Sequence, residues 1–132
     1  MLFRFLLFLL LLVPGSAFAQ QAVTTGRTTY QGTMALTAGV STPLTAANVT
    51  MSPGSGALPQ PGSFGRLTFI APGSGCQFTV NWGGGTATAT SGEQFGGTNL
   101  SSDTVDLTGT QNVPSLFSTA GCSSPNLVQF RN

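Results

Sequence analysis

Residues 76–82 constrain the fold more than any other part of this sequence. Apolar and polar side chains alternate strictly there: Cys76, Phe78, Val80 and Trp82 against Gln77, Thr79 and Asn81. This period of two is typical of a β-strand with one face in a core and the other in water. The stretch also holds the only Trp and one of the two cysteines. It is therefore expected to supply the largest ring of the core and one end of a covalent cross-link.

Composition supports a chain built from strands. The 132 residues suffice for one domain. Charged residues make up only 5%, against about 25% in ordinary soluble domains. Thr-rich segments favour strands, and the 18 Gly and 8 Pro interrupt them. The composition therefore indicates an all-β protein.

Short segments with strand character recur about every ten residues, separated by turn residues. They are residues 28–38, 44–51, 64–71, 76–82, 86–90, 104–108, 113–119 and 127–131. This spacing predicts a single antiparallel β-sandwich, jelly-roll or immunoglobulin-like, of about seven or eight short strands. Residues 67–82 are a candidate hairpin, and the Pro/Gly-rich residues 52–63 are expected to form a loop outside the core.

The N-terminus has the pattern of a secretory signal peptide over residues 1–19. Arg4 gives the positive start, residues 5–13 are apolar, and Ala17-Phe18-Ala19 is a small-x-small cleavage pattern. The apolar run is shorter than the roughly 20 residues that a membrane span needs. We expect a flexible arm over residues 20–27, a sandwich domain over residues 28–132, and a mature chain that is secreted, periplasmic or on the cell surface.

Cys76 and Cys122 are expected to form a disulfide, because two cysteines in an exported chain most often pair. A catalytic cysteine would need a base, and the chain has no His to act as one.

The mature chain carries three cations and three anions, and they sum to zero. These are Arg27, Arg66, Arg131, Glu93, Asp103 and Asp106. Without a basic cluster, nucleic acid is not an expected partner.

Catalysis is not expected, because a chain without His or Lys cannot build a Ser-His-Asp triad, a Ser-Lys dyad or a histidine metal site. We therefore predict a protein that is not an enzyme, with no catalytic residue, no metal site and no cofactor. Asp103 and Asp106 are read as charges that solvate a sheet edge. Two alternatives stay open: a glycan-active enzyme with two of the three carboxylates paired, and a calcium site that also uses Asn99.

Aromatic side chains suggest a further alternative, a carbohydrate-binding module. Trp82 and Tyr30 are the candidate ligand-stacking residues, although the alternation of residues 76–82 places Trp82 in the core. Asn48 and Asn99 stand in N-x-S/T acceptor patterns for glycosylation, which matter only in a eukaryotic source.

From Leu36 onward the chain contains, in order, residues 36–39 (LTAG), 44–48 (LTAAN), 66–69 (RLTF), 80–88 (VNWGGGTAT), 91–93 (SGE) and 113–118 (VPSLFS). This order of features resembles a small β-sandwich module of bacteriophage virions and bacterial surface proteins. Such modules decorate particles or fibres and are not enzymes. The export signal and the cysteine pair are not part of that pattern, so the resemblance implies the fold and assigns no functional residue.

The leading functional expectation is an exported, non-enzymatic structural, adhesive or surface-associated protein. The near-absence of ionic charge leaves little repulsion between copies, so self-association is an expected interaction. A surface glycan is the alternative partner.

Overall fold

The computed structural model describes residues 29–73 and 75–132. The signal peptide and the arm predicted for residues 1–27 lie outside the described residues. Within the described part the chain forms nine strands and one short 3-10 helix, Ala46–Asn48. The strands are β1 (Gln31–Met34), β2 (Ser41–Pro43), β3 (Val49–Met51), β4 (Arg66–Ile70), β5 (Phe78–Asn81), β6 (Glu93–Phe95), β7 (Ser102–Asp106), β8 (Ser115–Phe117) and β9 (Val128–Arg131).

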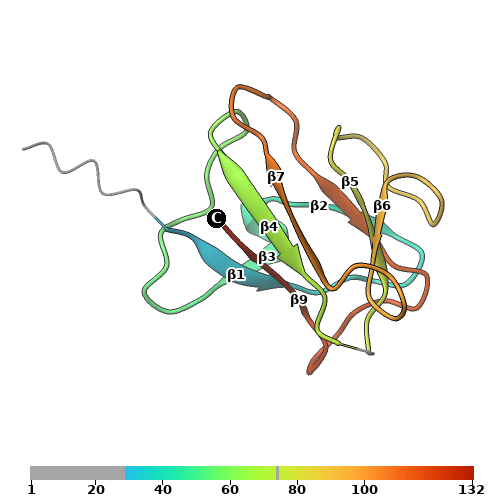
Figure 1. Ribbon diagram of the computed structural model, residues 1–132. Coiled ribbons are helices and arrows are strands. Elements are labelled where there is room, and N and C mark those ends of the chain that lie inside the picture. Colours follow the sequence, from blue (N-terminus) through green and yellow to red (C-terminus); the bar gives the residue numbers. More distant parts are fainter. Residues whose placement is uncertain (1–28, 74) are drawn as a thin grey trace, which may run out of the picture.

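The strands form two antiparallel sheets packed face to face, which confirms the predicted β-sandwich (Figure 1). One sheet has the strand order β3-β1-β9-β4-β7, and the other has the order β2-β8-β5-β6. The 3-10 helix links the edge strands β2 and β3, and residues 96–101 link the edge strands β6 and β7. The sandwich therefore has a β2/β3 side and a β6/β7 side.

The core lies between the sheets and is built from the apolar residues that alternation predicts. Phe78 and Val80 of β5 are buried, and so are Leu67 and Phe69 of β4. The rings of Phe78 and Phe95 stack at a centroid distance of 5.0 Å, and Phe69 meets Phe78 edge to face at 6.5 Å. The contact between Phe69 and Phe78 joins the two layers, because β4 belongs to one sheet and β5 to the other, whereas Phe78 and Phe95 stack within the four-stranded sheet.

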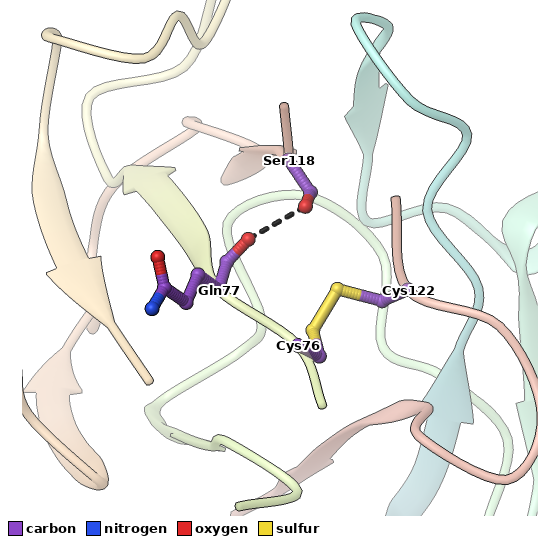
Figure 2. Close-up of a disulfide and its surroundings, with 4 residues drawn as sticks. All are labelled: Cys76, Gln77, Ser118 and Cys122. Atoms are coloured by element: carbon purple, nitrogen blue, oxygen red, sulfur yellow. Dashed lines mark hydrogen bonds between the residues drawn. A yellow bond between two sulfur atoms is a disulfide. The ribbon is translucent and has the colours of Figure 1, made fainter. Parts of the chain in front are cut away.

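Cys76 and Cys122 form the predicted disulfide, with Cα atoms 5.2 Å apart (Figure 2). Cys76 lies just before β5, while Cys122 exchanges two backbone hydrogen bonds of 2.8 Å with Leu36, which follows β1. Next to the disulfide, the Ser118 hydroxyl donates to the Gln77 carbonyl at 2.6 Å. The bridge thus ties one layer to the other at one end of the sandwich.

The hairpin predicted for residues 67–82 is wrong, because β4 and β5 lie in different sheets. β4 already has β7 and β9 on its two edges, and β5 has β6 and β8. The inward faces of β4 and β5 meet across the core instead. Alternation shows that a strand has an apolar face but does not distinguish a neighbour in one sheet from an opposite strand in the other.

Residues 86–90, predicted as a strand, form a loop segment over the outer face of the four-stranded sheet. Ala87 is only 1% exposed, and its N–H donates to the Ser41 hydroxyl of β2 at 2.9 Å. The run of Ala and Thr in this segment provides small side chains, and these permit the close approach. The segment predicted over residues 44–51 is also corrected, since its first half holds the 3-10 helix and only β3 is extended.

Candidate functional site

Trp82 follows β5 and turns toward the interior, where it packs half-buried against the core. Its ring lies 5.2 Å from Phe69, centroid to centroid, and its indole N–H donates to Glu93 Oε2 at 2.9 Å. The side chain is therefore held by an aromatic contact on one side and a charged acceptor on the other. This arrangement fixes the ring against the sandwich and leaves it poorly placed as an open stacking platform.

Replacing Trp82 by Phe should lower the free energy of unfolding by about 1 kcal/mol, because an aromatic ring remains while the hydrogen bond to Glu93 is lost. Urea unfolding followed by circular dichroism measures the change. Glu93→Gln keeps an acceptor and is the matched control, for which we expect a smaller effect. Equal stability of Trp82→Phe and the wild-type chain would contradict a stabilising role for this bond.

Tyr30, the other candidate for stacking on a sugar, is part of the core. It is 3% exposed, and its hydroxyl donates to the Phe64 carbonyl at 2.8 Å. The Arg66 carbonyl lies 3.2 Å from the same hydroxyl. A ring in this position leaves almost no surface on which a ligand could stack. Alternation could not reveal this, since Tyr has an apolar ring and a polar tip and fits either environment.

The three carboxylates all lie on the β6/β7 side. Glu93 is on edge strand β6 and bonds to Trp82, whereas Asp103 and Asp106 are on edge strand β7. Three positions separate the two aspartates, so they point to opposite faces of their strand. Among the described residues, no group of three or more Cys, His, Asp or Glu is placed to hold a metal ion. The two aspartates, at least, do not form the carboxylate pair that a glycosidase needs.

The β2/β3 side contrasts with the β6/β7 side because its groove is uncharged. A groove of about 650 Å³ runs there between the two edge strands, and its lining contains no charged residue. Thr and Ser hydroxyls, Asn48 and small apolar side chains form its walls, and Val40, 48% exposed, lies in it. The sandwich therefore has one acidic side and one uncharged side.

The four sheet edges differ in how they are protected from pairing with another strand. β7 carries two aspartates, and β2 contains Pro43, which has no N–H to donate. β6 is covered by its own chain, because the Gly96 N–H donates to the Leu100 carbonyl at 2.8 Å. β3 has neither a charge nor a proline. Of the four edge strands, β3 is the one that none of the described residues protects by a charge, a proline or a covering segment.

The backbone hydrogen bonds of β1 show which N–H and C=O groups of β3 point away from β1. The carbonyls of Thr29 and Gln31 accept from Gly56 and Ser52, so odd-numbered residues of β1 face β3. Thr33 and Thr50 therefore exchange hydrogen bonds, as their register requires. It follows that the Met51 N–H and the Val49 carbonyl point away from β1.

The two glycosylation acceptor patterns lie in different environments. The Asn48 amide donates to the Pro43 carbonyl at 2.8 Å and to the Thr45 hydroxyl at 3.1 Å. Asn99 is exposed in the loop between β6 and β7. A glycan on Asn48 would replace one of the two amide hydrogens and so remove at least one of these bonds, whereas one on Asn99 would meet solvent.

No family model, no curated protein and no solved structure matches this chain. Sequence similarity to known proteins therefore assigns no activity to it. Among residues 29–73 and 75–132, no helix has the length and hydrophobicity needed to cross a bilayer.

Proposed function

We propose that this protein is an exported, non-enzymatic structural or surface-associated protein that works by contact and associates with copies of itself. The disulfide supports an oxidising, extracytoplasmic environment, since such bonds rarely persist in a reducing cytosol. Asp103 and Asp106 point to opposite faces of β7, and this supports a role without catalysis by that pair.

The observation that carries the proposal is the uncharged β3 edge beside the uncharged groove, an edge that pairs with no further strand among residues 29–73 and 75–132. Like charges repel when copies meet at β7, where each copy brings two aspartates. No such repulsion acts at β3. Two copies related by a two-fold axis can place Thr50 opposite its equivalent, and each Met51 N–H then donates to the partner's Val49 carbonyl. The two five-stranded sheets become one continuous sheet.

We expect the mature protein to elute from a sizing column as species larger than a monomer, with a proportion that rises with concentration. Electron microscopy should show whether association stops at a closed dimer or continues into filaments or layers. Thr50→Lys brings two like charges together and should raise the dissociation constant of the dimer roughly tenfold. A monomer at every concentration would overturn the proposal.

Two further variants make the test specific to this edge. Thr104→Lys adds the same charge to the same sheet face but on β7, so it should leave β3 pairing unchanged. Thr50→Glu should weaken association like Thr50→Lys, and an equimolar mixture of Thr50→Lys and Thr50→Glu should restore it. Equal effects of Thr50→Lys and Thr104→Lys would show that copies meet elsewhere.

A further inference from the structure

The outer face of the four-stranded sheet contains a small hollow separate from the β2/β3 side. Its volume is about 160 Å³, well below the roughly 300–1,000 Å³ of pockets for drug-sized ligands. Gln94, Thr79 and Phe117 lie side by side on β6, β5 and β8 and form its floor, as their register shows. Ala89, from the loop over this face, forms one wall. The hollow therefore has the size for a single ring or a similarly small group.

Thr79 is the most informative residue in the hollow. It is 5% exposed, and no group in the described part of the chain bonds its hydroxyl, which stays open to solvent, since no fully buried side-chain nitrogen or oxygen there lacks a partner. A hydroxyl that is open to solvent and has no protein partner bonds to water, and a hydrogen-bonding group of a ligand can displace that water. The hydroxyl faces the hollow and shares the outward face with Phe117 and Gln94. A ligand in the hollow would take the place of that water.

The remaining lining determines which ligand fits. Gln77, Gln94 and Asn99 contribute amides, which both donate and accept hydrogen bonds, and no charged residue is present. Gln94 Nε2 is held by the Ala89 carbonyl at 3.2 Å, which leaves the oxygen of that amide available. Phe117 adds a half-buried aromatic ring. Uncharged donors and acceptors beside an aromatic ring suit a neutral molecule with both hydroxyl groups and apolar C–H faces.

We propose that this hollow binds one neutral sugar residue, with the Thr79 hydroxyl bonded to a sugar hydroxyl and the Phe117 ring against a C–H face. The site differs from the Trp82 and Tyr30 pair expected from sequence, and neither of those residues lines it. It is also independent of self-association, because the β3 edge belongs to the other sheet.

Titration of the ¹⁵N-labelled mature protein with glucose, galactose, mannose and N-acetylglucosamine tests the proposal by NMR. At least one sugar should shift the backbone and side-chain amide resonances of Gln77, Gln94 and Asn99, with a roughly millimolar dissociation constant. A short oligosaccharide of the responding sugar shows whether a chain terminus or a free monosaccharide is preferred. If none of these sugars shifts those resonances, the proposal is wrong.

Thr79→Val separates binding from structure. The change keeps the side-chain shape and removes the hydroxyl, so affinity should fall roughly fivefold, which corresponds to the loss of one neutral hydrogen bond. Stability should not fall, because no described group of the protein depends on that hydroxyl. Thr104→Val is the matched control: it breaks a 2.7 Å contact with the Thr68 hydroxyl and should leave sugar affinity unchanged. Unchanged affinity in Thr79→Val, or a loss of stability without a loss of affinity, would overturn the proposal.

Discussion

Replacing Cys76 and Cys122 together by Ala should lower the free energy of unfolding by about 4 kcal/mol or slightly more. The disulfide closes a loop with a sequence separation of 46 residues, and in the chain-entropy model a loop of this length accounts for about 4 kcal/mol. Loss of the two buried sulfur atoms adds a smaller packing term. Since small domains are stable by only about 5–15 kcal/mol, roughly a quarter to four-fifths of the stability margin would disappear.

Urea unfolding at equilibrium measures this effect, and the reduced wild-type protein is the matched control. Reduction removes the cross-link but keeps both sulfur atoms, so the difference between the reduced protein and the double variant gives the packing term. A difference in stability of less than about 1 kcal/mol between the oxidised and the reduced protein would contradict the chain-entropy explanation. Residual structure in the unfolded chain would then be the explanation.

Gly92→Ala should lower the free energy of unfolding by about 3 kcal/mol or more. Gly92 has φ +106°, outside the regions that L side chains favour, and a methyl group there would overlap the carbonyl oxygen of Val80. Val80 lies in the middle of the four-stranded sheet and cannot move without disturbing its pairing with β6 and β8.

Gly85→Ala separates backbone strain from the clash. Gly85 also has positive φ, +79°, but a methyl group there would meet nothing within 4 Å. We expect it to cost only about 1 kcal/mol. Thermal or urea unfolding of both variants gives the comparison, and equal losses would show that the overlap with Val80 is relieved by local movement.

The sequence was sufficient to predict the class of fold and the cross-link. Alternation in residues 76–82 identified the inward-facing Phe78 and Val80 of β5 but not the burial of Thr79 on the other face, and an export signal with two cysteines predicted the disulfide. Which strands pair was not predictable from these patterns. β4 and β5 follow each other in sequence but lie in opposite sheets, because several strand arrangements bury the same alternating faces.

The candidate sites were less predictable than the core. The aspartates of β7 do lie on a sheet edge, as their isolation in a chain with few charges suggested. The position of β3 at a sheet edge depends on pairing between residues far apart in sequence, and the hollow near Thr79 depends on three strands and one loop. The nearest local signal was the outward position of Thr79 in the alternating stretch.

The bridge between Cys76 and Cys122 also affects how the protein responds to proteases. β5, β6, β7 and β8 all lie between the two cysteines, so they belong to one covalently closed ring of chain. A single cut inside that ring, for example at the exposed Gly109, leaves two fragments that remain joined through sulfur. A nicked molecule can therefore keep both its layers, and electrophoresis separates the pieces only after reduction.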